Sequence, residues 1–469
     1  MKKSLPFYFI VISIFLLMIS PFLFARGMFV DGIVYANFSK NFAIGQGSFL
    51  HPFYSLTYLT DFNSHPPMFF FLQGLFFKVF GTSFLIERFY SVLSIVLAGI
   101  ITIKIYKILD LKTKFLPIFF LVLIPLITWS ATNNIIENTL IIFTSLSALF
   151  YLYSLKSKRL IFLFLAGISL AIGFSIKGFV AFFPLSLPFI YWLVIRKTKF
   201  KRMFLDTILI ILFSISPIII SIYSSADIMD YFLNYFNTQI IGSIENEVTV
   251  SSRFYIVWIF LRELLIPIII IGLLALVIRF RKKTSIFKNK ENNKKALMMF
   301  LFSLTAVLPI MISMKQSGFY IITAFPFAAI ALSALIDEYV NELISKINIK
   351  SKGFTILKYL SVFLLVFSIS LCFVFIGKDS RDKKLLSDMD IITKHIPQNA
   401  IISVPIQMEE EYYLFAYYAR FHNISIDLNS DIQRKYLLIK NDYEYNFEEM
   451  NYKKVDIETQ SFNLYEKEN

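Results

Sequence analysis

Long apolar runs, separated by short polar or basic segments, occupy most of residues 1–377. A helix that crosses a bilayer needs about 20 mainly apolar residues. This length predicts eleven transmembrane helices, with approximate bounds 5–24, 84–106, 115–132, 137–155, 159–175, 179–195, 203–223, 256–279, 296–314, 318–336 and 354–377. We therefore expect residues 1–377 to form a polytopic α-helical membrane domain.

The first loop, residues 25–83, contains two shorter amphipathic runs. In residues 31–44 apolar side chains recur every four positions, and polar side chains fill the other side of the helix that this spacing predicts. The apolar positions are Val34, Phe38 and Phe42, and the polar ones are Asn37, Ser39, Lys40 and Asn41. Residues 67–80 form a second apolar run, too short to span. Both runs are expected to be helices in the membrane interface.

The chain becomes polar and charged from residue 378 to residue 469. Alternation typical of strands occurs at 401–406, 424–428, 435–439 and 454–460, and a helix-like run occurs at 409–421. A segment of about 90 residues is long enough to fold as a domain of its own. The tail is therefore predicted to be a small α/β domain.

The composition agrees with a membrane protein. Of the 469 residues, 57% are hydrophobic and 17% are charged, and the mean hydropathy is +0.66. These values lie outside the range of ordinary soluble domains. The single cysteine, Cys372, lies inside an apolar run, which excludes a disulfide framework and a thiolate metal site.

The net charge of +14 is interpreted as a topology signal, because Lys and Arg concentrate in short loops between apolar runs. With the N-terminus inside, the basic loops all fall on the cytoplasmic side: 104–114, 156–159, 196–202, 279–295 and 346–352. The pattern predicts an N-in, C-out orientation, with the first loop, residues 225–255 and the tail outside. It argues against a nucleic-acid partner, since no soluble module carries a basic face.

Five titratable residues lie near the outer ends of predicted spans: Asp31, His65, Glu137, Lys177 and Lys315. A charged side chain costs about 2.5 to 3.5 kcal/mol at the bilayer centre and less at the interface, so each position needs a reason. Simpler interpretations stay open: Asp31 as a solvated acid, His65 as a turn residue and Glu137 as an acid favoured at a helix N-terminus. The two lysines could extend to lipid headgroups.

Together these residues suggest one type of reaction. Cations on the outer side could bind the phosphate that leaves a lipid and stabilise its growing charge. An acid could remove the proton of an attacking hydroxyl or amine.

Five short motifs follow one another along the chain in a recognisable order. They are DGIVYA after the first span, HPP before the second amphipathic run, ERFYS at the start of the second span, KG between the fifth and sixth spans, and KQSGFYIITAFP. The ordered set, across about residues 5 to 340, resembles the GT-C glycosyltransferases. The most similar members are the bacterial protein-mannosyltransferase-like and lipid A aminoarabinose transferase-like group.

The resemblance implies a polyprenyl-phosphate-linked sugar donor drawn from the bilayer, and inverting transfer to an envelope acceptor. That acceptor would be lipid A, a glycan or a protein, on the periplasmic or extracellular side of a bacterial inner membrane. Residue by residue, Asp31 matches the catalytic acid and Glu137 the second acid. The remaining matches, which would hold the lipid phosphate, are Lys177, Lys315 and Tyr320, with His65 and Arg88 as further contacts.

Four positions depart from the pattern of this group. Gly32 follows the acid where a second acid is common, and Val34 replaces an arginine of the aminoarabinose transferases. Ser64 and His65 replace a Glu-Lys pair, which removes an expected carboxylate ligand for a metal. The resemblance therefore implies neither aminoarabinose as the sugar nor a divalent metal as a cofactor.

A lipid or glycan transporter without transferase activity is the alternative, and a membrane sensor that uses its tail is a third possibility. Transporters place charged residues near the midplane on broken helices and often consist of repeated halves. Here the charged residues lie at span ends, and the sequence shows no internal repeat. Convergence of Asp31, His65, Lys177 and Lys315 on one outward cavity would favour the transferase.

Overall fold

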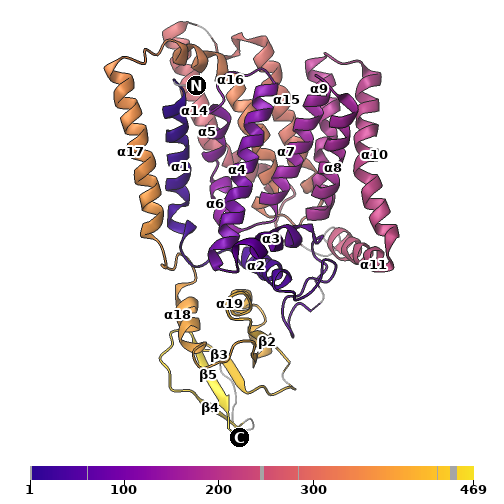
Figure 1. The fold of residues 1–469 in the computed structure, drawn as a ribbon, viewed down its shortest axis with the longest axis vertical. Helices are drawn as coiled ribbons and strands as arrows, with labels where there is room; N and C mark the ends of the chain where they lie inside the picture. The colour runs from indigo at the N-terminus through magenta and orange to yellow at the C-terminus, as the bar shows by residue number, and fades with distance from the viewer. Residues whose placement is uncertain are drawn as a thin grey trace.

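The computed structural model describes residues 3–60, 62–242, 248–283, 285–429, 431–443 and 451–468. A helical bundle forms the larger part, and a small domain with a sheet is attached to one end of it (Figure 1). The start of the first helix lies at the end of the bundle far from this domain (Figure 1). A helical membrane domain followed by a small strand-containing domain is thus confirmed.

The bundle consists of long helices joined by short connections. Its α-helices are α1 (Leu5–Leu23), α4 (Phe84–Ile108), α5 (Leu116–Val122), α6 (Pro125–Asn133), α7 (Glu137–Ser154), α8 (Arg159–Lys177), α9 (Leu187–Ile195), α10 (Phe200–Ser224), α13 (Tyr255–Glu263), α14 (Leu265–Lys282), α15 (Lys290–Val307), α16 (Phe325–Ser345) and α17 (Lys352–Val374). Shorter elements are α11 (Ala226–Tyr235), the 3-10 helices η1 (Gly178–Ser186), η3 (Ile286–Lys288), η4 (Leu308–Ile312) and η5 (Gly318–Ala324), and the π-helix η2 (Phe236–Ile241).

Within the described residues, seven helical segments are long and apolar enough to cross a membrane, or nine if two bent pairs each count as one. The pairs are α5 with α6, bent by 72°, and α13 with α14, bent by 48°. The sequence predicted eleven because it separated α8 from α9 and included α7, which is richer in hydroxyl groups. The number of crossings and their direction stay predictions.

The sequence predicted two spans where one apolar segment, residues 159–195, is counted, and the contacts of α8 and α9 show how this segment is arranged. Arg159 at the start of α8 pairs with Asp206 near the start of α10, at 2.6 Å. The last residue of α9, Ile195, comes five positions before Phe200, where α10 begins. Both ends therefore lie at the same end of the bundle, and α8 runs opposite to η1 and α9.

Outer helices of the bundle present large apolar side chains to their surroundings. On α17 these include Phe363 and Val366, which are 63% and 57% exposed, and on α10 they include Leu212 and Ile220. Helices satisfy their own backbone hydrogen bonds, so an apolar exterior of this kind suits a lipid environment.

The first and last helices of the bundle lie side by side (Figure 1). The rings of Phe24 and Phe373 stack with centroids 5.3 Å apart. Beyond the helix ends, Arg26 forms a salt bridge of 2.7 Å with Asp379. Residues some 350 positions apart therefore close the bundle.

Two helices of the first loop, α2 (Val30–Ala43) and α3 (Met68–Phe80), lie at the end of the bundle next to the small domain (Figure 1). Both predicted helices are therefore present. The predicted polar side of α2 does not face solvent, however, since Asn37, Ser39, Lys40 and Asn41 are buried. Their partners are backbone oxygens: Asn41 donates to the Tyr54 carbonyl at 3.0 Å, and Asn37 does so at 2.9 Å. Protein groups, and not water, therefore surround the polar side of α2.

The small domain contains a five-stranded sheet with strand order β2-β1-β3-β5-β4. Its elements are α18 (Lys383–Ile392), β1 (Ile401–Ser403), η6 (Ile406–Met408), α19 (Tyr412–His422), β2 (Ser425–Asp427), β3 (Tyr436–Lys440), β4 (Tyr452–Lys454) and β5 (Phe462–Lys467). Strands β2, β1 and β3 are parallel, and β5 and β4 are antiparallel to their neighbours. The strand predicted at 454–460 is wrong: β4 ends at Lys454, and β5 follows it.

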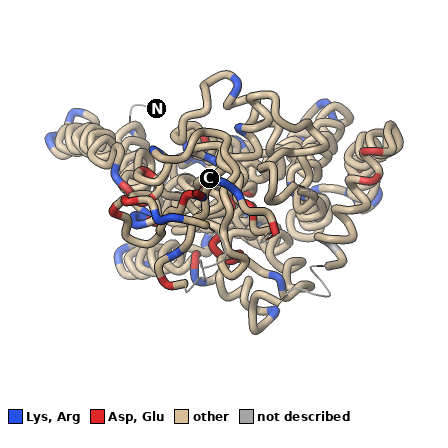
Figure 2. The backbone as a smooth tube through the Cα atoms, turned by 90° about the horizontal axis from the view of Figure 1, so that it is seen from below, with Lys and Arg blue, Asp and Glu red and all other residues tan. Residues whose placement is uncertain are grey.

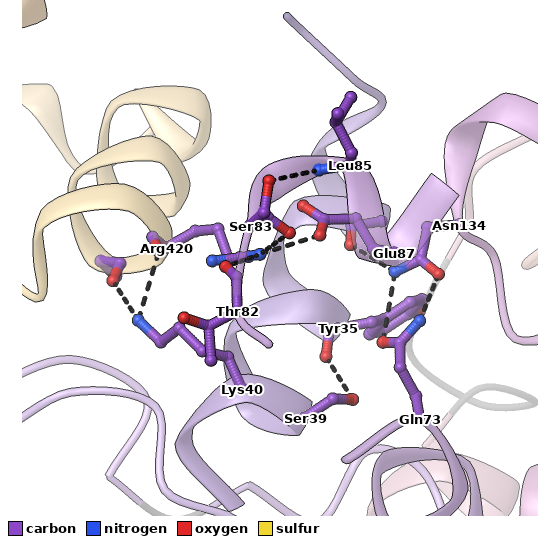
Figure 3. A network of polar contacts seen from close by, with 12 residues as sticks. Tyr35, Ser39, Lys40, Gln73, Thr82, Ser83, Leu85, Glu87, Asn134 and Arg420 are labelled. Atoms are coloured by element: carbon purple, nitrogen blue, oxygen red, sulfur yellow. Dashed lines mark hydrogen bonds and ion pairs between the residues drawn. The ribbon is translucent and has the colours of Figure 1, made fainter. Parts of the chain in front are cut away.

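Charged side chains join this domain to the bundle. In the view from below, acidic residues lie mostly in the central region over the small domain, whereas Lys and Arg also occur at the periphery (Figure 2). Arg420 on α19 pairs with Glu87 on α4 at 2.8 Å, and both side chains are only 3% exposed. Close by, Lys40 of α2 donates to the backbone oxygens of Ala419 and Arg420 (Figure 3). The domain is thus docked on the helix that carries Asp31.

Candidate active site

A cavity of about 380 Å³ opens where three distant parts of the chain meet. His65 comes from the segment before α3, Lys177 from the end of α8, Lys315 from the connection into η5, and Tyr320 from η5 itself. Much of the remaining wall is apolar and includes Phe179, Val180, Phe183, Ile310 and Ile312. Four of the residues singled out in the sequence therefore line one cavity.

Lys177 is the last residue of α8, and its charge is paired. Its ammonium group forms an ion pair with Glu137 at the start of α7, and it lies 4.4 Å from the centroid of the Tyr320 ring. The side chains of Lys177 and Glu137 are 13% and 1% exposed, so a headgroup-directed lysine does not describe this arrangement. A buried pair of this kind keeps both charges satisfied at the cavity wall.

Gly178 makes the turn after Lys177 possible. Its φ of +69° lies in the region that favours glycine, and an added Cβ would come 2.1 Å from the Tyr235 hydroxyl. The glycine thus allows the chain to reverse directly behind the lysine.

Asp31 lies in the first turn of α2, close to Glu137 and Lys177 but outside the residues that line the cavity. Burial raises the pKa of its carboxyl to about 6; the charge of Glu137 acts in the same direction and that of Lys177 opposes it. Asp31 is therefore an acid that ionises near neutral pH.

The neighbouring Gly32 explains how Asp31 reaches this position. A Cβ at Gly32 would lie 2.0 Å from the backbone oxygen of Asn133, and Asn134 donates to the Gly32 carbonyl at 2.9 Å. Gln73 of α3 holds the Asn134 side chain in turn, at 2.5 Å (Figure 3). The glycine that replaces a second acid thus permits close packing of α2 on the junction before α7.

His65 is buried and is joined to two tyrosines. Its Nε2 lies 3.0 Å from the Tyr35 hydroxyl, and its backbone oxygen accepts a hydrogen bond of 2.6 Å from Tyr231. Burial, together with the charges of Lys177 and Lys315, lowers the pKa of the imidazole to about 3. At neutral pH His65 is therefore an uncharged hydrogen-bonding group, and not a third cation of the cavity.

Lys315 lines the same cavity from the segment between η4 and η5. Its ammonium group lies 3.5 Å from Oε1 of Gln239, which also lines the cavity. Its backbone N–H donates to the Ser313 hydroxyl at 2.9 Å. Lys315 thus brings a second ammonium group to the cavity wall, beside Lys177 with its paired charge.

Arg88 is not part of this group. Its guanidinium donates to the Gly27 carbonyl at 2.5 Å, the side chain is 2% exposed, and Arg88 does not line the cavity. It holds the backbone between α1 and α2, so the interpretation as a direct phosphate contact does not agree with its position.

The sequence reasoning missed Tyr35, Tyr231 and Gln239. Tyr35 lies four positions after Asp31, on the same side of α2, which was the available signal. Tyr231 lies on α11 and Gln239 on η2, in a stretch without a motif, so nothing in the sequence indicated them. Within the described part of the chain, no three or more His, Cys, Asp or Glu side chains are placed to hold a metal ion.

Residues 64–220 match the family model of dolichyl-phosphate-mannose-protein mannosyltransferases. In structure, the chain is similar to ArnT from Cupriavidus metallidurans bound to undecaprenyl phosphate, with a TM-score of 0.67 and 14% identity over 97% of both chains. The apo form of that protein gives a TM-score of 0.63 at 15% identity, over 97% of this chain and 96% of that one.

A third similar structure is the oligosaccharyltransferase AglB from Archaeoglobus fulgidus, in complex with an inhibitory peptide and a dolichol-phosphate. Its TM-score is 0.50 at 11% identity, over 94% of this chain and 70% of that one. No curated protein sequence matches the chain.

The protein is therefore a multi-pass membrane protein with the GT-C glycosyltransferase fold. Within this class, its resemblance to the mannosyltransferase-like and aminoarabinose-transferase-like group is confirmed. The fold and the family match support a membrane glycosyltransferase.

Proposed function

We propose that the protein transfers a sugar, with inversion, from a polyprenyl-phosphate donor to an envelope acceptor. The reaction would take place on the side of the membrane that carries the small domain, the periplasmic or extracellular side of a bacterial inner membrane. The main supporting observation is the cavity that combines Lys177 and Lys315 with an apolar wall. This combination suits a ligand that is anionic at one end and greasy at the other.

The cations would hold the donor phosphate. Lys177 and Lys315 would stabilise the charge that grows on the phosphate as it leaves, which is how preorganised cations lower a barrier. Tyr320 would donate a hydrogen bond, and neutral His65 would add a further polar contact. Because Lys177 is paired with Glu137, an arriving phosphate would compete with that carboxylate for the ammonium group.

Asp31 would act as the general base. A base works best when its pKa is near the operating pH, and a carboxyl with a pKa of about 6 is mostly ionised at pH 7 while still able to accept a proton. The acceptor oxygen or nitrogen would lose its proton to Asp31 and attack the anomeric carbon as the C–O bond to the phosphate breaks. Glu137 would position the sugar or the acceptor.

The test uses purified protein in proteoliposomes with a panel of polyprenyl-phosphate-linked sugars and an envelope extract as acceptor. Asp31→Asn should reduce transfer by about 10²-fold to 10⁴-fold, the usual contribution of a general base. Asp110→Asn is the matched control, since Asp110 is exposed at the far end of the bundle and pairs with an exposed lysine. Normal transfer by Asp31→Asn would show that the base is assigned incorrectly.

The transporter alternative predicts a different result. A flippase would move the labelled lipid across the vesicle membrane without breaking the sugar–phosphate bond. Measuring free polyprenyl phosphate therefore separates the two functions, because only transfer releases it.

A further inference from the structure

A second, larger cleft lies beside the cavity and has the opposite charge. It measures about 620 Å³ and is formed by the first loop and α11. Its size falls within the range of about 300 to 1,000 Å³ that is usual for small-molecule sites. None of the seven site residues named from the sequence lines it.

The cleft and the cavity share a thin partition. Phe62 and Asn63 line the cleft, whereas the next two residues, Ser64 and His65, line the cavity. Tyr231 lines the cleft, and its hydroxyl donates a hydrogen bond of 2.6 Å to the His65 backbone oxygen. A ligand in the cleft would thus be separated from the phosphate cavity by one segment of backbone.

Helix α11 and the start of η2 contribute to both spaces. Asp227, Asp230, Tyr231 and Asn234 line the cleft, and Tyr235 and Gln239 line the cavity. The same short stretch of chain would therefore contact both substrates of a transferase.

The cavity and the cleft differ in the charge of their lining residues. The cavity carries Lys177 and Lys315, whereas the charged side chains that line the cleft, among the described residues, are Asp227 and Asp230. His51 also lines the cleft. Since like charges repel, the cleft disfavours a phosphate group and the cavity attracts one.

The polar groups that line the cleft suit hydroxyl-rich ligands. A carboxylate accepts hydrogen bonds, and the amides of Asn63 and Asn234 both donate and accept, which matches hydroxyl groups that do the same. Phe53, Phe62 and Tyr231 add apolar ring surface for the C–H faces of a sugar. Asp227 lies in the first turn of α11, where an acid is favoured for helix stability alone, but Asp230 lies beyond that turn.

We infer that this cleft binds the acceptor, and that the acceptor is a glycan which is neutral or amine-bearing in the part that enters the cleft. The inference rests on the proposed function for the word acceptor, but the binding of such a glycan can be measured without any transfer. Because Asp227 and Asp230 line the cleft, the part of the acceptor that binds there should not carry a phosphate group.

The experiment measures binding to the full chain in lipid nanodiscs by microscale thermophoresis. The probes are three trisaccharides of equal length: chitotriose with free amines, N-acetylchitotriose and trigalacturonate. Undecaprenyl phosphate is the probe for the cavity. We expect chitotriose to bind most tightly and trigalacturonate most weakly.

The variant Asp227→Asn with Asp230→Asn should weaken chitotriose binding about five- to tenfold, the effect of two charge pairs made by exposed carboxylates. Asp456→Asn with Glu458→Gln is the matched control, because both acids are exposed on the small domain and the charge change is equal. Both double variants should keep the affinity for undecaprenyl phosphate, which Lys315→Ala should weaken.

Three results would overturn the inference: equal chitotriose affinity of the wild type and the cleft variant, preference for trigalacturonate, or no binding of any trisaccharide. Tighter binding of a Ser/Thr-rich hexapeptide in the cleft would replace the glycan by a protein acceptor. If chitotriose binds as expected but undecaprenyl phosphate does not, the proposed transferase fails and the glycan site stands.

Discussion

Asp31 and Glu137 are two carboxylates beside one lysine, in different environments. Glu137 forms an ion pair with Lys177, whereas no hydrogen bond is made by the Asp31 carboxylate within the described residues. Burial raises the pKa of Asp31 to about 6. Environments that differ in this way assign different tasks to two acids. In the proposed mechanism, Asp31 would therefore accept the proton, whereas Glu137, paired with Lys177, would have a positioning role.

The pH dependence of transfer tests this assignment. A base must be ionised, so kcat/KM should be constant above about pH 7 and fall about tenfold per pH unit below the raised pKa of about 6. The profile is measured with the proteoliposome assay from pH 4.5 to 8, values chosen to bracket that pKa within roughly two units.

Residual activity of Asp31→Asn provides the control and should lack this break. A wild-type profile that stays flat to about pH 5 would show that no group of this pKa acts as the base.

Isolated charges were readable from the sequence, because a charged residue at a span end has few structural reasons to exist. Lys177 and Lys315 were found in this way. Tyr231 was not, since a chain with 25 tyrosines offers no contrast, and Tyr35 was part of the motif DGIVYA but was given no role. The neutral state of His65 follows from burial and from two lysines distant in sequence, which only the fold brings near.

At the scale of elements, the position of α2 depends on one glycine. Gly32→Ala would place a methyl group 2.0 Å from the Asn133 backbone oxygen, which cannot move without shifting α6. We expect α2 to be displaced and transfer to fall about 10²-fold, as small misplacements of catalytic groups do. The assay is transfer activity together with the melting temperature.

Gly272→Ala in α14 is the matched control, because nothing lies within 4 Å of its added Cβ. It should leave activity unchanged and not lower the melting temperature, since alanine favours helix. Equal activity of Gly32→Ala and Gly272→Ala would contradict the role of the close approach.

Periodicity predicted α2 and α3 to within a few residues, but not what covers them. Burial of the polar side of α2 arises from Tyr54 and from the small domain, and neither contact is local in sequence. The predicted span 115–132 was treated as continuous, although Pro125 starts a new helix after a 72° bend. The strand at 454–460 was misplaced because alternation gives no register relative to a partner strand.

At the scale of the molecule, the Arg420–Glu87 pair holds the small domain on the bundle. Arg420→Met would leave Glu87 buried without its partner, which costs about 3 to 5 kcal/mol. The small domain should then become sensitive to protease at concentrations that leave the wild type intact.

The double variant Arg420→Met with Glu87→Gln should recover part of the protection, because it removes the uncompensated charge. Lys435→Met is the control: its pair with Glu466 is exposed, and such pairs contribute about 0 to 1 kcal/mol. If Arg420→Met and Lys435→Met behave alike, the buried pair does not hold the domain.

The pairing of α1 with α17 has a consequence for biosynthesis. The ribosome delivers α1 first, and domains assemble from the N-terminus as the chain emerges. Phe373, which stacks on Phe24, is synthesised some 350 residues later, so α1 is in the membrane for that time without α17, its main neighbour. A chain truncated before Lys352 would lack α17 and leave the face of α1 that packs against it exposed. Every chain passes through this state during synthesis, where cellular quality control can recognise it.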